Sequence, residues 1–202
     1  PKAIAALPFD AWVTSGGTLA FSYATQVSTS PASDKQYRLT NGGSLPASSI
    51  TVTSSQTITG TYVTQHRVTF DQSGLGTTGT NLVLTVGTTT FAKGSLPGTR
   101  VWDTGTTWTY QGIVDTSPAS GTRFRLTSPA TGSLGAADAG TTITGTYVTQ
   151  YQITFAQSGI GLDTGSNTVV TVDGSPKTAA NLSFSKFVDA GDTVVYAFST
   201  PV

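Results

Sequence analysis

Thr57–Gln65 reads TITGTYVTQ, and the same nine residues return 85 positions later at Thr142–Gln150. A related strand and turn follow each copy, as HRVTFDQSGLG from His66 and as YQITFAQSGIG from Tyr151. Self-similarity at a fixed step is the sequence signature of a repeat architecture. A step of this length is too long for one coil of a solenoid and fits a whole domain. The sequence therefore predicts a tandem array of domain-sized units.

Other landmarks keep nearly the same step. Gly16, Gly105 and Gly191 correspond, and a second set of corresponding positions consists of Phe21, Tyr110 and Tyr196. The step divides the chain into three units, which are residues 1–64, 65–149 and 150–202. We expect the second unit to be complete, the first to lack its first strands, and the third to lack its last strands.

The two ends of the chain resemble each other. Residues 1–27 align without a gap onto residues 176–202. We therefore expect the chain to begin and end inside a unit, with strands from outside completing both end units. These strands come either from adjoining repeats of a longer chain, which the overlap favours, or from a copy of the protein by donor-strand complementation. The second route creates a head-to-tail contact that does not close, and hence a filament.

The second unit contains six short β-branched or aromatic runs, at residues 66–70, 81–86, 99–103, 107–112, 123–127 and 142–149. Several alternate in the way that a half-buried strand requires. Trp108 and Tyr110 share one face, and Phe124 and Leu126 share another, opposite Arg125. Gly, Pro, Ser and Asp fill the intervening turns. The predicted fold class is all-β, with tandem immunoglobulin-like antiparallel β-sandwich repeats of about 86 residues.

Composition excludes several classes of function. Lys and Arg total 10, Asp and Glu total 10, and every acidic residue is Asp. No strongly basic face can be built from so few cations, so we expect no nucleic-acid partner. Cys is absent, which removes disulfides and thiolate chemistry. No apolar run reaches the roughly 18–20 residues that span a bilayer, so we expect no membrane insertion in this segment.

Few residues suit catalysis or ion binding. His66 is the only histidine, and Tyr151 takes its place in the next unit, so we assign it a structural role. We therefore predict no enzyme activity, no cofactor and no catalytic residue. Calcium is the least implausible ion, because several Asp residues of the third unit lie in Gly-rich turns. Their spacing matches no calcium loop, so we predict no metal site and assign them to ordinary turns: Asp163, Asp173, Asp189 and Asp192.

Asn181-Leu-Ser is the single N-glycosylation sequon and marks Asn181 as a candidate glycan site. A set of aromatic residues could either form a sugar-binding platform or lie in the core: Trp12, Phe21, Trp102, Trp108, Tyr110 and Tyr196. Alternation within strands favours the core for most of them. A flat exposed row of aromatic rings would instead favour a binding module.

The phrases TGTYVTQYQITFAQSGIG, VVTVDG and the short LPF/LSF elements resemble the tandem immunoglobulin-like repeats of large archaeal cell-surface proteins. The resemblance covers essentially the whole chain and carries no catalytic residues. It implies an extracellular, cell-surface structural protein in a stalk, a surface-layer-associated array or a filament, with glycans as candidate modifications. The alternative from another class is an adhesin that recognises a glycan or a protein on another surface.

Overall fold

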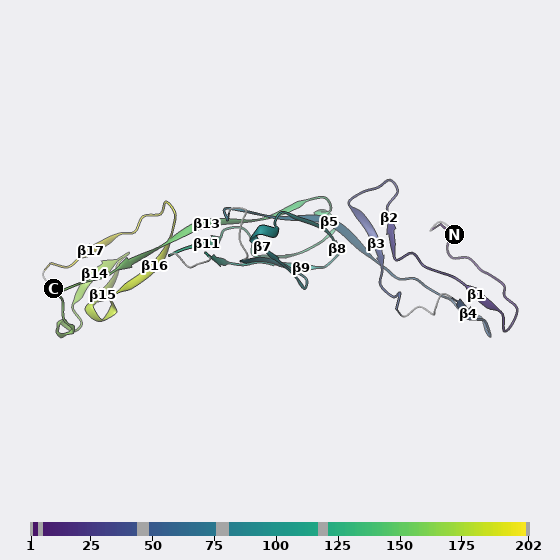
Figure 1. Ribbon diagram of the computed structural model, residues 1–202, viewed down its shortest axis with the longest axis horizontal. Helices are drawn as coiled ribbons and strands as arrows, with labels where there is room; N and C mark the ends of the chain where they lie inside the picture. Colours follow the sequence, from purple (N-terminus) through teal and green to yellow (C-terminus); the bar gives the residue numbers. More distant parts are fainter. Residues whose placement is uncertain (1, 4–5, 44–48, 76–80, 117–120, 201–202) are drawn as a thin grey trace.

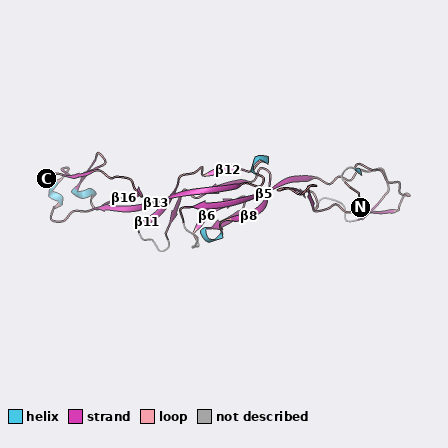
Figure 2. Ribbon diagram, turned by 90° about the horizontal axis from the view of Figure 1, so that it is seen from above, coloured by secondary structure: helices cyan, strands magenta, loops and turns pink. Residues whose placement is uncertain are grey.

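The computed structural model describes residues 2–3, 6–43, 49–75, 81–116 and 121–200. The chain is all-β and elongated, with its N-terminal and C-terminal parts at opposite ends of the long axis (Figure 1). The helical segments of the described residues are short 3-10 turns (Figure 2). We use the three units of the sequence as names for the corresponding regions. The ends of the two aligned stretches, residue 1 and residues 201–202, lie outside the described ranges.

Two sheets face each other in the second unit. The larger sheet has the order β10-β11-β13-β5-β3-β2, with β8 on β5 and β16 on β13. The smaller sheet has the order β12-β9-β6-β7. The strands of the larger sheet are Gln26–Ser28 (β2), Lys35–Leu39 (β3), Tyr62–Ser73 (β5), Gly98–Asp103 (β8), Ile113–Asp115 (β10), Thr122–Leu126 (β11), Thr142–Phe155 (β13) and Phe184–Asp189 (β16). Those of the smaller sheet are Leu82–Val86 (β6), Thr89–Ala92 (β7), Thr107–Tyr110 (β9) and Thr131–Ser133 (β12).

The main core lies between these sheets. It contains fully buried side chains from both, including Phe70 of β5, Leu84 of β6 and Tyr110 of β9. Trp108, Phe124 and Leu126 pack against the cluster, so the predicted inward faces are confirmed. Rings meet edge to face, as in the pair of Trp108 and Tyr110 at 5.7 Å, which is the preferred geometry for aromatic quadrupoles. The result is a sandwich-like, all-β arrangement.

The third unit has a smaller core. A three-stranded sheet of order β15-β14-β17 contains Thr168–Val172 (β14), Ser175–Thr178 (β15) and Tyr196–Phe198 (β17). Its buried cluster is Phe155, Val170 and Val172, against which Phe184 and Val194 pack.

The first unit is more open. Thr18–Ala20 (β1) pairs with Ser49–Thr51 (β4) in a two-stranded sheet, while β2 and β3 join the larger sheet through β5. Along the described part of the chain, buried hydrophobic side chains begin at Val68.

The six strands predicted for the second unit are all present, and TITGTYVTQYQITF forms one unbroken strand, β13. Three further strands of the second unit were not predicted from the sequence: β7, β10 and β12.

The structure also corrects two correspondences. In the first unit Tyr23, and not Phe21, takes the place of Tyr110, because its ring covers Gly60 and its hydroxyl donates to Ile58 O, as Tyr110 covers Gly145 and bonds to Ile143 O. Phe198 pairs with Val170 of β14 just as Tyr110 pairs with Leu84 of β6, so Phe198, and not Tyr196, takes the place of Tyr110. The cause is a loop after Gly191 that is two residues longer than the loop after Gly105.

Candidate functional site: the junctions between units

Two long strands run from one unit into the next. β5 pairs first with β3 of the first unit and then with β8 of the second, and β13 pairs first with β11 and then with β16 of the third unit. On each strand two successive residues lie opposite both neighbours, Gln65 and His66 on β5 and Gln150 and Tyr151 on β13. Gln65 is opposite Gln36 and Asp103, so three strands from two units meet in one row at that residue.

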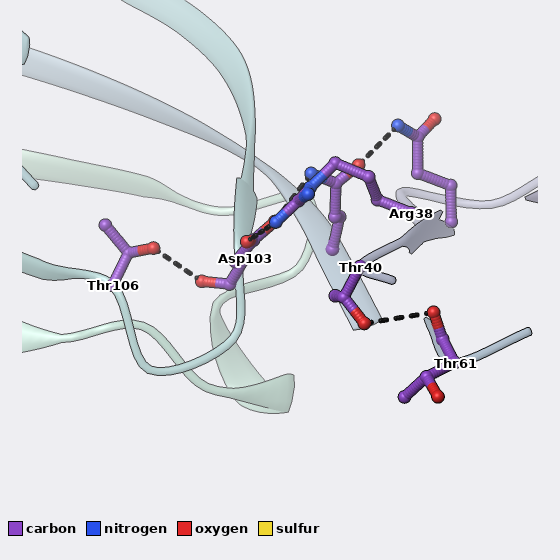
Figure 3. Close-up of polar contacts among 7 residues, drawn as sticks. Arg38, Thr40, Thr61, Asp103 and Thr106 are labelled. Carbon is purple, nitrogen blue, oxygen red and sulfur yellow. Dashed lines mark hydrogen bonds and ion pairs between the residues drawn. The ribbon is translucent and has the colours of Figure 1, made fainter. Parts of the chain in front are cut away.

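Side chains connect this row at the first junction. Gln65 donates from Nε2 to Asp103 Oδ1 at 2.7 Å and accepts at Oε1 from Gln36 Nε2 at 2.8 Å. Arg38 of the first unit donates from Nε to Asp103 Oδ1 at 3.2 Å and from Nη2 to Oδ2 (Figure 3). Gln65 is 6% exposed. A buried amide therefore has both of its ends paired, and a two-pronged ion pair joins the first unit to the second.

The second junction repeats this arrangement. Gln150, also 6% exposed, donates from Nε2 to Asp189 Oδ1 at 2.7 Å and accepts from Arg123 Nε at 2.7 Å. Arg125 donates from Nε to Asp189 Oδ1 at 3.1 Å and from Nη2 to Oδ2. We call each set of four residues a junction clasp: Gln36, Arg38, Gln65 and Asp103 at the first junction, and Arg123, Arg125, Gln150 and Asp189 at the second.

The electrostatics of the two clasps agree. The hydrogen bonds from Arg38 lower the pKa of the Asp103 carboxyl, with a further contribution from Gln65, against the opposing effect of burial. The hydrogen bonds from Arg125 and then from Gln150 lower the pKa of Asp189 in the same way. Bidentate Arg–carboxylate pairs combine strength with fixed orientation. The clasp is therefore suited to holding two units at one angle.

The opposite face of the junction strands differs between the two junctions. At the first, His66 is 3% exposed and lies opposite Trp102. Within the described ranges, neither His66 Nδ1 nor Trp102 Nε1 has a hydrogen-bond partner. At the second junction Tyr151 replaces His66 and is 51% exposed. The structural role assigned to His66 fits its burial, and its position does not recur as a site.

The aspartates considered as calcium ligands are in part bound to cations of the chain itself. Asp173 pairs with Lys186 and also accepts from the backbone N–H of Val195 at 3.0 Å, while Asp189 belongs to the second clasp. The described residues contain no group of three or more His, Cys, Asp or Glu side chains that could hold a metal ion.

Asn181, the residue of the glycosylation sequon, is exposed at the end of the 3-10 turn Ala179–Asn181. Its Oδ1 accepts from the backbone N–H and from the hydroxyl of Thr178, both at 3.1 Å. These bonds orient the side chain while the residue stays exposed. The position is therefore sterically open to a glycan.

The aromatic residues divide between core and surface. Trp102, Trp108 and Tyr110 belong to the core of the second unit, as alternation predicted. Trp12 is 100% exposed and Tyr196 is 58% exposed, so these two do not lie in a core. Their exposure leaves apolar surface on both end units.

The junction clasps were not predicted from the sequence. Asp103 and Asp189 each precede a turn glycine, Gly105 or Gly191, which is a sufficient local explanation of an aspartate, yet each carboxylate also binds an arginine of the preceding unit. A signal was present, because the three essential positions recur together: Arg38 and Arg125, Gln65 and Gln150, and Asp103 and Asp189 lie 85 to 87 residues apart. Recurring polar residues at a strand junction indicate a shared contact.

No family model, curated protein or solved structure matches the chain. Among the described residues, no helix has the length and apolar character that crossing a bilayer requires.

Proposed function

We propose that this chain is an extracellular structural repeat protein in which tandem immunoglobulin-like units of about 86 residues form a stiff rod. The rod is part of a stalk, a surface-layer-associated array or a filament on a cell surface. The observation that carries the proposal is the recurrence of the same clasp at both junctions, each built on a strand shared by two units.

A shared strand leaves little freedom between units. A Gly/Ser linker behaves as a flexible coil, but here the backbone at Gln65 lies in a strand that is paired on both sides. Bending the rod at this point requires the breaking of ladder hydrogen bonds together with the Arg38–Asp103 pair. The units 1–64, 65–149 and 150–202 are thus coupled as consecutive segments of a rod, which is the mechanical requirement of a stalk or a filament.

The extracellular setting is supported by composition and by the sequon. The chain has few charges, many Thr, Ser and Gly residues, and an exposed Asn181 in a glycosylation sequence. Its resemblance to archaeal cell-surface repeats points in the same direction. The proposed partners are copies of itself or adjoining repeats of a longer chain, which complete the sheets of the end units, together with glycans. The proposal includes no enzymatic activity.

A second candidate function is adhesion, and one observation favours it. The first unit exposes Trp12 at 100%, Phe9 at 52% and Leu7 at 43%. Exposed aromatic side chains close together in the chain could recognise a glycan or a protein on another surface. The rod would then present this end to its target.

Immunogold electron microscopy of sectioned source cells tests the proposal, with an antibody raised against residues 65–149. Gold particles on extended structures outside the cell are the expected result, and labelling confined to the cell interior would refute it. A glycan array distinguishes the two functions, with the Trp12→Ala variant as its control. Specific glycan binding that this variant loses would establish the adhesin instead of the purely structural protein.

A further inference from the structure

The second unit contains one parallel strand pair. Thr142–Thr146 of β13 runs alongside Thr69–Ser73 of β5. Tyr110 joins the two strands, since its hydroxyl lies 2.7 Å from Asp71 O and 2.9 Å from Ile143 O and shares its one hydrogen between these two acceptors. The ring of Tyr110 covers Gly145 so closely that a Cβ there would lie 2.5 Å from a ring carbon. These contacts join β5, β9 and β13 in the part of β5 that follows the first junction.

Both halves of this pair recur without a partner among the described strands. Thr57–Thr61 has the same sequence as Thr142–Thr146, yet β5 begins only at Tyr62. Residues 156–158 correspond to residues 71–73, yet β13 ends at Phe155. An identical pentapeptide is a strand in one place and not in the other, so its conformation follows from pairing and not from local sequence. Thr57–Thr61 and residues 154–158 therefore correspond to the two strand segments that pair in the second unit.

The apolar surface points to the same place. A depression beside the end of β13 is lined by two polar residues, Thr154 and Asp192, and by six apolar or aromatic residues of the third unit: Ile153, Phe155, Ala156, Val194, Tyr196 and Phe198. Phe198, which takes the place of Tyr110, is 51% exposed, whereas Tyr110 is 1% exposed. Ile153 is 38% exposed at the same edge. Among the described residues, no strand therefore covers Phe198 in the way that β13 covers Tyr110.

We propose that Thr57–Thr61 of a second copy pairs in parallel with residues 154–158 of the first. The register of the second unit then places Thr57 opposite Thr154 and Thr59 opposite Ala156. Gly60 lies beneath the ring of Phe198, as Gly145 lies beneath that of Tyr110. Within a single chain, the region around β4 and that around β14–β17 are at opposite ends (Figure 1), so these two segments of one chain do not meet and the proposed pairing joins two copies.

The pairing has one local competitor in the free chain. Tyr23 covers Gly60, since a Cβ at Gly60 would lie 2.5 Å from its ring, and its hydroxyl donates to Ile58 O at 2.7 Å. An incoming Phe198 takes over this ring contact. Because the donor edge and the acceptor edge are different surfaces, the contact is head-to-tail and extends into a filament. The inference rests on the self-association included in the proposed function.

Engineered cysteines test the register, because the chain has none of its own. The single variants Thr59→Cys and Ala156→Cys are purified, mixed in equal amounts and oxidised. Mass spectrometry then measures the share of disulfide dimers that contain one chain of each kind. We expect at least nine tenths of the dimers to be mixed. The control pairs Thr59→Cys with Ala180→Cys, an exposed position away from the edge, and should give the statistical half. A statistical half from Ala156→Cys would overturn the inference.

A synthetic peptide of residues 57–65 provides the second readout. It should suppress the mixed dimer at a concentration at least tenfold lower than a peptide carrying Gly60→Val, whose side chain collides with the aromatic ring. Equal suppression by both peptides would overturn the proposed position of Gly60 beneath the ring of Phe198. If the mixed dimer does not form but X-ray scattering shows a rod-like monomer, the docking edge is refuted and the proposed rod is not. If scattering instead shows a flexible monomer, the rod itself is refuted.

Discussion

Replacement of Gln150 by Leu removes the centre of the second clasp at nearly constant volume. The side chain is 6% exposed, and each of its two hydrogen bonds, both 2.7 Å long, has a charged partner. Hydrogen bonds to charged groups contribute about 1.5–3 kcal/mol net. Arg123 and Asp189 keep some access to water, and Asp189 keeps Arg125, so part of that contribution is recovered. We therefore expect the free energy of unfolding to fall by about 2 kcal/mol.

Urea unfolding followed by tryptophan fluorescence and by circular dichroism measures this loss. Gln152→Leu, an exposed position two residues along the same strand, is the matched control and should change stability by less than about 0.5 kcal/mol. Gln65→Leu tests the equivalence of the junctions. Its loss should be smaller, about 1.5 kcal/mol, because Gln36 is a neutral partner where Arg123 is charged. A Gln150→Leu protein indistinguishable from the Gln152→Leu control would refute the reasoning.

Three further perturbations probe the core, the parallel pair and the clasp charge. Phe70→Ala, at a fully buried side chain, should lower the free energy of unfolding by about 3–5 kcal/mol in calorimetry. Gly145→Ala should cost about 1–3 kcal/mol in urea unfolding because its Cβ would meet the Tyr110 ring at 2.5 Å, whereas Gly112→Ala, with open space around it, should cost less than about 0.5 kcal/mol. Folding lowers the pKa of Asp189. The contribution of its carboxylate to stability is therefore fully present above the unfolded pKa of about 3.9 and is lost as the pH falls through the lower folded pKa. Melting temperatures measured against pH should show this loss, and Asp189→Asn should reduce it.

Much of the fold could be predicted because the sequence repeats the same strand and turn patterns. The repeated TITGTYVTQ, the alternation of Trp108 with Tyr110, and the Gly-rich turns all follow from strand periodicity and turn chemistry. The strands that escaped, such as β10 and β12, span three residues each. Such segments are strands because of their partners, and their own sequences carry little periodic signal.

The candidate site was harder to predict for a different reason. Asp103 has a sufficient local explanation in its turn, and that explanation hides the partner 65 residues earlier, Arg38. Only the pairing of β3 and β8 on opposite sides of β5 brings the two side chains together. The same limit applies to Phe198, whose place in the fold depends on a loop two residues longer than its counterpart. A register shift of this kind becomes visible only in the strand pairing.

Small-angle X-ray scattering of the dilute monomer tests the central claim most directly, because the claim is that the clasped junctions fix the angles between units. We expect a scattering curve that one elongated conformation reproduces. We also expect that combining Gln65→Leu with Gln150→Leu broadens the distribution of maximum dimensions. If the wild-type curve required an ensemble of bent and extended conformations, and the double variant gave the same ensemble, the junctions would be hinges and the account would be contradicted.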